Sequence, residues 1–359
     1  EVAFLPDGKR VLTASEDGTV RLWDIDCASV SPTECDAPTR IFTDTASFAA
    51  RPNGFEVKGI AVRPGRNQFI TANSDYTLKL WDIDCATPSA QLCESPTRVF
   101  AAGNGGHTQE ANLVTFNADG SRALSSSEDT SIILWDVESG APLRQMFDPN
   151  KMEIRGVSIL PDGRTALSGG AAGELDKWDL ETGQLLDRLR GHKGTIYNVA
   201  HNADGSQAIT GGADNSVIVW DLEKNVPATV LRGHGGYIRQ AVFSKDGKHA
   251  LSGSQDKTIR VWDLFNGAEN VRLRSSSPIN SVSVSADGST IATGDDAGEI
   301  QIWDGTTGQA RGNYIWHERE VTAVALSPDG SFVLSGGGKA DGALLLTDLK
   351  TGQVIDRFR

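Results

Sequence analysis

Residues 237–273 read YIRQAVFSKDGKHALSGSQDKTIRVWDLFNGAENVRL, and this stretch decides the fold class. Residues 237–243 alternate as a short strand, and the segment 244–247 ends in Asp-Gly, which favours a tight hairpin turn. Residues 249–253, 258–262 and 269–273 form three more short strands, separated by turns at 255–257 and at Asn266-Gly267. The stretch therefore predicts four antiparallel strands joined by hairpins.

The same unit recurs along the whole chain and is marked by a Trp-Asp pair near the end of its third strand. The pairs begin at Trp23, Trp81, Trp135, Trp178, Trp220, Trp262 and Trp303, and Thr347-Asp348 stands in the eighth place. Successive spacings are 58, 54, 43, 42, 42, 41 and 44 residues. A single four-stranded sheet cannot bury both of its faces, so eight units must pack face to face. No segment shows sustained 3.6-residue periodicity, and we expect almost no helix.

A period near 42 residues with a Trp-Asp pair resembles the WD-repeat family, and the resemblance covers the whole chain. It implies an all-β, eight-bladed β-propeller of four-stranded antiparallel blades, forming a single domain over residues 1–359. The blades are expected at about 1–43, 55–100, 110–147, 153–189, 195–231, 237–273, 279–311 and 321–359. Because the sequence starts at Glu1 without methionine, we expect it to be part of a longer polypeptide.

The charge balance excludes several classes of partner. Asp and Glu number 47 against 34 Lys and Arg, which gives a formal net charge of −13. Nucleic acids and anionic membrane surfaces both attract basic patches, and none is visible. No apolar run approaches the roughly 18 residues of a membrane span, so direct membrane insertion is not expected. A protein or a basic peptide segment is the partner that this charge favours.

Four polar or aromatic positions recur at fixed spacing in the regular blades. They are His107, Ser125, Asp129 and Trp135; His192, Thr210, Asp214 and Trp220; and His234, Ser252, Asp256 and Trp262. A hydrolase needs one special copy of such a set, so repetition argues against catalysis. The family resemblance instead implies a buried hydrogen-bond chain that satisfies polar groups inside each blade.

Several blades depart from this pattern, and we expect them to be looser than the others. Blades 2 and 4 have Asn53 and Asn150 in the histidine position, and Ala172 replaces the aspartate of blade 4. Blade 7 has Ser275 in place of histidine and Ala297 in place of aspartate. Blade 8 keeps His317 but lacks the tryptophan.

Two similar insertions carry the four cysteines. Cys27 and Cys35 lie after the first Trp-Asp pair, and Cys85 and Cys93 lie after the second, each with seven intervening residues. A hairpin connection brings its ends together, so disulfides Cys27–Cys35 and Cys85–Cys93 are geometrically plausible. Free thiols and a four-thiolate zinc site are the alternatives, although a seven-residue gap argues against zinc. Disulfides would place the protein outside a reducing cytosol (periplasmic, cell-surface or secreted), and the alternative is a cytoplasmic location.

The family resemblance also implies where partners dock, namely three and five residues past the histidine position on one face. The residues on which we place most weight there are Arg155, Tyr197, Tyr237 and Arg239, with Lys58, Glu110, Glu153 and Glu320 as charged neighbours. Tyrosine and arginine most often dominate binding energy. The apolar connection at residues 46–50 is a second candidate contact.

These observations favour a non-catalytic scaffold for protein–protein interaction, as one domain or subunit of a larger assembly. No phosphate-binding loop, nucleophile elbow, calcium loop or metal-ligand spacing is present, so we expect no catalytic residue, metal or cofactor. A small-ligand or enzymatic propeller is the first alternative, and it requires a unique set of reactive groups. A structural protein that associates with itself is the second.

Overall fold

The computed structural model describes residues 2–7, 10–14, 17–24, 38–45, 47, 56–85, 92–100, 105–244, 247–285, 288–305, 307, 309–315, 317–327, 330–338 and 343–358. Among these residues the regular elements are strands, and helical backbone occurs only at Thr45 and Ser47. The chain divides into two compact units. The first comprises Glu1, Leu12–Trp23 and Pro38–Arg190, and the second comprises Val2–Val11, Asp24–Ala37 and Gly191–Arg359.

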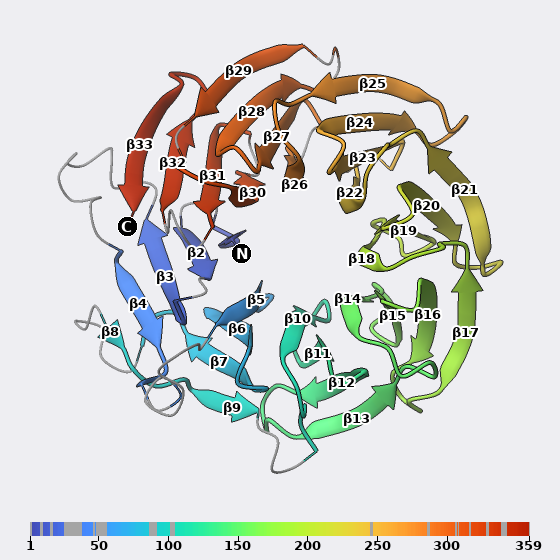
Figure 1. The fold of residues 1–359 in the computed structure, drawn as a ribbon. Helices are drawn as coiled ribbons and strands as arrows, with labels where there is room; N and C mark the ends of the chain where they lie inside the picture. Colours follow the sequence, from blue (N-terminus) through green and yellow to red (C-terminus); the bar gives the residue numbers. More distant parts are fainter. Residues whose placement is uncertain are drawn as a thin grey trace. The chain divides into compact units, whose positions relative to one another are not determined.

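Each sheet takes its strands in chain order (Figure 1). The sheet of blade 1 runs β1 (Val2–Phe4), β2 (Arg10–Ala14), β3 (Thr19–Asp24), β4 (Arg40–Thr43) and β8 (Leu92–Cys93). Blade 2 runs β5 (Val57–Val62), β6 (Gln68–Asn73), β7 (Leu78–Asp82) and β9 (Arg98–Phe100). Blade 3 runs β10 (Ala111–Phe116), β11 (Arg122–Ser127), β12 (Ser131–Asp136) and β13 (Pro142–Phe147). Blade 4 runs β14 (Ile154–Ile159), β15 (Thr165–Gly170), β16 (Glu174–Asp179) and β17 (Leu185–Arg190).

The second unit holds blades 5 to 8. Blade 5 runs β18 (Ile196–His201), β19 (Gln207–Gly212), β20 (Ser216–Asp221) and β21 (Val226–Arg232). Blade 6 runs β22 (Ile238–Phe243), β23 (His249–Ser254), β24 (Thr258–Asp263) and β25 (Glu269–Arg274). Blade 7 runs β26 (Ile279–Val284), β27 (Thr290–Asp295), β28 (Glu299–Asp304) and β29 (Ala310–Ile315). Blade 8 runs β30 (Val321–Leu326), β31 (Phe332–Gly337), β32 (Leu344–Asp348) and β33 (Gln353–Phe358). The predicted fold class, an all-β propeller of eight four-stranded antiparallel blades, is confirmed.

Glycine closes the hairpin between the first and second strands of the regular blades. Gly120 and Gly205 have φ angles of 70° and 73°, in the left-handed region that side-chain-bearing residues rarely adopt. The amide of Gly120 donates to the carbonyl of Asn117 at 3.0 Å, which closes the turn. The Asp-Gly signal in the sequence therefore marks a real backbone requirement at these turns.

The tryptophans of blades 3, 4, 6 and 7 pack against the blade before them in the chain. Trp262 of blade 6 joins a cluster with Val217, Val219 and Leu231 of blade 5, and all of them are buried. Its partner on the second strand is Ala250, whose small side chain leaves room for the indole. Burial of one tryptophan side chain stabilises the folded state by roughly 3 kcal/mol, at the upper end of the range of about 1.5–3 kcal/mol for large apolar side chains. In these blades the tryptophan therefore fills the interface between two neighbouring blades.

A cysteine-bearing insertion of blade 2 reaches the sheet of blade 1. Strand β8 comes from the segment between β7 and β9, and it pairs in parallel with β4 through Ile41–Leu92 and Phe42–Cys93. Cys93 is at disulfide distance from Cys85, with Cα atoms 6.1 Å apart. The insertion thus adds a two-residue fifth strand to blade 1, which the sequence pattern did not predict.

Candidate interaction surfaces

The recurring polar residues of blade 6 form a directional hydrogen-bond chain. His234 Nδ1 lies 2.9 Å from Asp256 Oδ2, and His234 Nε2 lies 2.8 Å from Ser252 Oγ. Trp262 Nε1 donates to the same Ser252 Oγ at 2.8 Å. A carboxylate only accepts and an indole only donates, so Nδ1 carries the proton and the serine hydroxyl donates to Nε2. Every polar atom of the chain is then satisfied inside the blade.

Blades 3 and 5 repeat this geometry. The distances from His107 to Asp129 and Ser125 are 3.1 and 2.7 Å, and that from Trp135 to Ser125 is 2.9 Å. The distances from His192 to Asp214 and Thr210 are 2.9 and 2.8 Å, and that from Trp220 to Thr210 is 2.8 Å. Ser125, Thr210 and Ser252 are fully buried. In all three blades the hydroxyl is therefore buried and bonded to both an imidazole and an indole.

Burial sets the ionisation of the blade 6 chain. Removal from water disfavours the imidazolium and lowers the pKa of His234 to about 4, despite the opposing attraction of Asp256. Burial alone would raise the pKa of Asp256, but hydrogen bonds from Thr258, Gly235 and His234 outweigh it and lower that pKa to about 2. Near neutral pH the pair is a neutral imidazole that donates to a carboxylate.

Blade 2 has a buried ion cluster in place of this chain. The Lys79 ammonium, 1% exposed, lies 2.6 Å from Asp75 Oδ2 and 3.0 Å from Asp44 Oδ2. It also donates to Ser47 Oγ at 3.0 Å. Asn53, which the sequence places in the histidine position, is outside the described residues. The cation comes from the third strand instead.

Blade 4 has a second ion cluster, centred on Arg188 of β17. Its guanidinium contacts Asp176 through Nε and Nη2 at 2.8 Å each, and Nη2 also reaches Asp148 at 2.8 Å. Hydrogen bonds to Asp176 raise the pKa of Arg188, so the cation is permanent. Asn150, in the histidine position, donates to Glu174, which also contacts Arg188.

Blade 7 recovers the aspartate two residues earlier than the pattern predicts. Ser275 Oγ donates to Asp295 Oδ2 at 2.6 Å, and the amides of Ala297 and Glu299 each donate to Asp295 Oδ1 at 2.9 Å. Asp295 thus takes the place of the aspartate that the repeat pattern has at position 297. The sequence analysis did not predict this replacement. For blades 2 and 4 a signal existed: Lys79 and Asp176 stand where blade 3 has the apolar Ile133.

The predicted docking positions of the first unit form charged groups. Lys58 Nζ lies 2.9 Å from Glu110 and 3.2 Å from Glu56. Arg155 pairs with its own neighbour Glu153 at 3.1 Å. Burial, with repulsion from Glu110 and Glu153, raises the pKa of Glu128 at the β11–β12 turn. At these positions the acidic side chains therefore outnumber the basic side chains that pair with them.

The predicted positions of the second unit include an aromatic cluster. The rings of Tyr197 and Tyr237 have centroids 6.2 Å apart, and the guanidinium carbon of Arg239 lies 5.1 Å from the centre of the Tyr197 ring. Tyr237 is 45% exposed, and Arg239 is exposed. The structure thus brings together Tyr197, Tyr237 and Arg239, while Arg155 belongs to the first unit. Glu320, half-buried, lies over Gly338 of blade 8.

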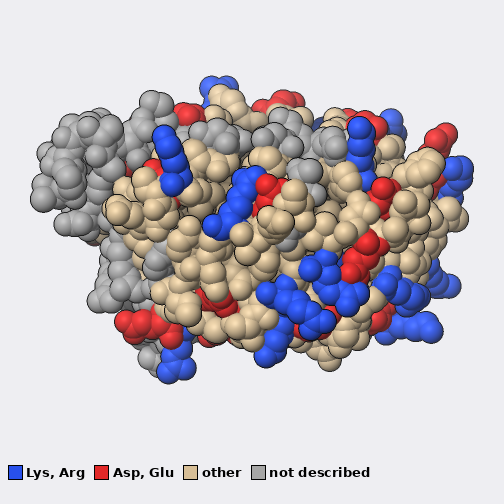
Figure 2. Space-filling model, turned by 90° about the horizontal axis from the view of Figure 1, so that it is seen from above, with Lys and Arg blue, Asp and Glu red and all other residues tan. Residues whose placement is uncertain are grey.

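Basic side chains of the outer strands occur beside acidic ones. Figure 2 shows lysine and arginine side chains gathered on the side where β25 and β29 lie, with acidic side chains among them. On β25, Arg272 pairs with Glu269 at 2.6 Å, and Arg260 of β24 pairs with the same carboxylate. Neutralised pairs of this kind do not create the uncompensated positive field that a nucleic-acid surface needs.

The remaining sequence candidates divide between described and undescribed residues. Cys27, Cys35 and residues 46 and 48–50 lie outside the described part of the chain. Within the described part, no cluster of three or more His, Cys, Asp or Glu side chains could hold a metal ion. No helix there is long and apolar enough to cross a membrane.

Comparisons with known proteins agree with this architecture. The family model "WD domain, G-beta repeat" matches residues 1–24, 95–136, 183–221, 225–263, 270–304 and 308–348. Apoptotic protease-activating factor 1 of Rattus norvegicus is 25% identical over 94% of this chain and 25% of its own length. Autophagy-related protein 16 of Arabidopsis thaliana is 30% identical over 55% of this chain and 33% of its own length. Cilia- and flagella-associated protein 52 of Homo sapiens is 22% identical over 55% of this chain and 28% of its own length.

The chain thus spans a third or less of the length of these relatives. The family model covers more than half of the chain; five of its six matches end at a Trp-Asp pair, and the sixth ends at Thr347-Asp348 of blade 8. The predicted membership is therefore confirmed: the chain belongs to the WD40 family of WD-domain, G-beta repeat proteins.

Proposed function

We propose that this chain is a non-catalytic platform that binds other proteins, with Tyr197, Tyr237 and Arg239 as its principal contact residues. The observation that carries the proposal is the clustering of these three side chains at an exposed position of blades 5 and 6. Membership of a family whose domains commonly serve as interaction platforms supports it. The buried state of the repeated serine and threonine hydroxyls argues against a hydrolytic role for them.

The geometry of the cluster suits an anchor for a partner. Tyr237 offers a large, rigid ring at low entropic cost, and Arg239 is held over Tyr197 by a cation–π contact. Since its side chains already support one another, less freedom is lost when a partner binds. Residues of these two types at the centre of an interface commonly cost about 2 kcal/mol or more when truncated to alanine.

We infer a basic segment as the partner's contact in the first unit. Glu110 and Glu153 lie at docking positions and Glu128 lies in the β11–β12 turn; burial, with added repulsion from Glu110 and Glu153, raises the pKa of Glu128. A lysine or arginine from a partner would relieve that repulsion. The net charge of −13 would also speed the approach of a basic partner at low salt.

The test is affinity capture with crosslinking from the native host, compared between the wild-type chain and the triple variant Tyr197→Ala, Tyr237→Ala and Arg239→Ala. Phe265→Ala is the control, because Phe265 is 99% exposed on the β24–β25 turn, outside the cluster. We expect the main captured protein to be lost with the triple variant and retained with the control. Equal capture by all three chains would refute the proposed contact.

A second arm tests the inferred charge of the partner. Glu110→Gln, Glu128→Gln and Glu153→Gln together should weaken binding of Lys/Arg-rich peptides and reduce its dependence on salt. A chain that instead sediments as concentration-dependent oligomers, and captures only copies of itself, would favour the structural alternative.

We also propose an extracytoplasmic location, on the ground that Cys85 and Cys93 lie at disulfide distance. Intact mass after thiol alkylation, with and without prior reduction, tests this on protein from the native host. Labelling only after reduction supports the proposal. Immediate labelling of Cys85 and Cys93 would move the partner search to the cytosol.

A further inference from the structure

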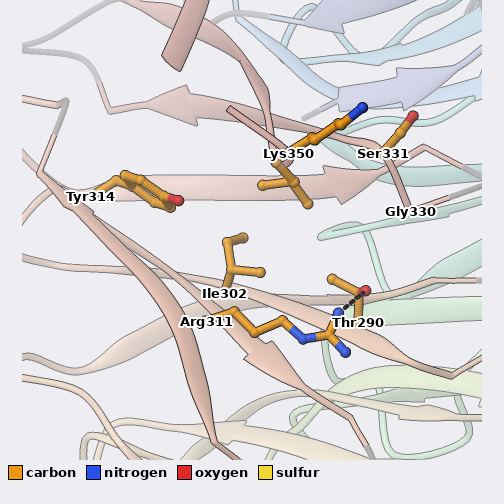
Figure 3. A pocket seen from close by; sticks show the side chains of 8 residues that line it. Thr290, Ile302, Arg311, Tyr314, Gly330, Ser331 and Lys350 are labelled. Atoms are coloured by element: carbon orange, nitrogen blue, oxygen red, sulfur yellow. Dashed lines mark hydrogen bonds between the residues drawn. The ribbon is translucent and has the colours of Figure 1, made fainter. Parts of the chain in front are cut away.

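A cavity of about 240 Å³ lies between blades 7 and 8 of the second unit (Figure 3). It is lined by Thr290, Ile302, Arg311, Tyr314, Gly330, Ser331, Leu349 and Lys350. Gly330 belongs to the turn after β30 and Leu349 to the turn after β32. The cavity is therefore at the opposite end of the strands from the docking positions, which lie at the beginning of the first strand of each blade. It is a separate feature from the surface proposed above.

The cavity lies where other blades bury a tryptophan. Trp262 of blade 6 packs on Val219 and Leu231 of blade 5, and Trp303 of blade 7 packs on blade 6 in the same way. In blade 8 the equivalent residue is Thr347, opposite Val333. The blade 7 residues that an indole would cover are Ile302 and Tyr314, and both line the cavity.

Gly312 of β29 leaves open space beside Ile302. Gly312 pairs with Ile302, whereas in blade 6 the equivalent pair is Val271 with Val261. No side chain from position 312 therefore covers Ile302. The ring of Tyr314 folds back over Gly312, where a Cβ atom would collide with the tyrosine hydroxyl oxygen. Tyr314 therefore forms an aromatic side of the cavity, and Ile302 and Leu349 form an aliphatic side.

The polar groups around this apolar floor are cationic or hydroxylic. Arg311 is oriented by an ion pair to Asp304 and a 3.2 Å hydrogen bond to Thr290 Oγ1. Figure 3 shows Lys350 and Ser331 on the other side of Ile302 from Arg311 and Thr290. The Lys350 ammonium has no ion-pair partner among the described residues. A held guanidinium and an unpaired ammonium together favour an anionic group.

We propose that this cavity binds a small aromatic carboxylate, whose ring takes the place of the missing tryptophan and whose carboxylate meets Arg311. The volume is below the roughly 300–1,000 Å³ of drug-sized sites, so one fused ring with a short acid chain is the fitting size. Ile302, Leu349 and Tyr314 supply the apolar contact that ring burial requires. Asp304 keeps Arg311 oriented before the ligand arrives, which limits the entropy lost on binding.

The first test is calorimetric titration of the wild-type chain with indole-3-propionate and with its neutral amide. We expect the acid to bind at least about tenfold more tightly than the amide, because hydrogen bonds to an ionised acceptor are about twice as strong. Equal affinities for acid and amide, or binding of neither, would overturn the proposal. Much tighter binding of a peptide ending in a free C-terminal tryptophan would assign the site to a protein terminus and overturn the small-molecule source.

Two variants locate the binding. Arg311→Gln should weaken the acid at least tenfold, while Arg272→Gln should leave it unchanged; Arg272 is a matched control, 43% exposed against 46% and paired with a carboxylate in blade 6. Thr347→Trp should abolish binding and raise the unfolding temperature, because the new indole can fill the cavity and donate to Ser335, which already contacts His317. Binding that survives both Arg311→Gln and Thr347→Trp would place the ligand elsewhere. If Thr347→Trp does not fold, the acid–amide comparison and Arg311→Gln decide the question alone.

Discussion

Replacing Ser252 by alanine tests whether the histidine link stabilises a blade, and Ser168→Ala in blade 4 is its matched comparison. Ser252 Oγ connects two buried partners, His234 Nε2 and Trp262 Nε1, both at 2.8 Å. Ser168 Oγ accepts the same bond from Trp178 at 2.8 Å, but no histidine stands beside it. Both serines are buried, so the two substitutions remove the same atoms from similar surroundings.

The two variants should differ in the number of polar atoms left without a partner. A buried donor or acceptor that loses its partner costs about 1–3 kcal/mol. Ser168→Ala strands one indole N–H and should therefore cost about 1–2 kcal/mol, whereas Ser252→Ala strands an indole N–H and an imidazole nitrogen and should cost about 2–4 kcal/mol.

Urea unfolding, with amide exchange of β15 and β23 as a local readout, measures both variants. We expect a clearly larger drop in the midpoint for Ser252→Ala, with an unchanged urea dependence of the unfolding free energy. Equal losses for the two variants would show that the imidazole bond contributes nothing. The hydrogen bond between the histidine and the serine would then be a consequence of the fold and would not stabilise it.

Three further perturbations follow from the same contacts. The pKa of His234 falls from 6.5 to about 4 on folding, so the unfolded chain binds the proton more readily; stability should drop by roughly 3 kcal/mol as pH falls from about 6.5 to 4, and His234→Asn should flatten that part of a stability–pH curve. Lys79→Met leaves two buried carboxylates without their cation and should cost about 3–5 kcal/mol in urea unfolding, more than any exposed lysine does. Opening Cys85–Cys93 by Cys93→Ser should cost about 2–3 kcal/mol at most and act locally, seen as faster amide exchange in β4 with little change in blade 4.

The fold was predictable because each local signal repeats. Trp-Asp spacing, Asp-Gly turns and strand alternation all point to one hairpin-connected unit, and independent signals that agree specify a fold strongly. The fifth strand β8 was not predictable in the same way. It comes from a single insertion that pairs with the sheet of another blade through only Leu92 and Cys93. A pairing of two residues is too short to produce a periodic pattern in the sequence.

The candidate site was predictable only in part, for a related reason. The positions of Tyr197, Tyr237 and Arg239 follow from their place in the repeat, but the stacking of Arg239 on Tyr197 depends on side-chain geometry. The ion clusters around Lys79 and Arg188 escaped prediction because their partners Asp44 and Asp148 lie outside the repeated positions. A repeat pattern identifies which residue is missing and says little about which residue replaces it.

The departures from the repeat do not all have the same consequence, and the difference is physical. In blades 2, 4 and 7 the lost polar residue is replaced by another buried polar group, since an unpaired buried atom would be costly. In blade 8 the lost residue is a tryptophan, and what disappears is volume rather than a hydrogen bond. Volume can be left open at the surface at modest cost if water or a ligand enters, as at the cavity beside Ile302. Ser335, which bonds to His317, already offers the acceptor that an indole at position 347 would need, so Thr347→Trp should fill the space and stabilise the protein in the absence of ligand.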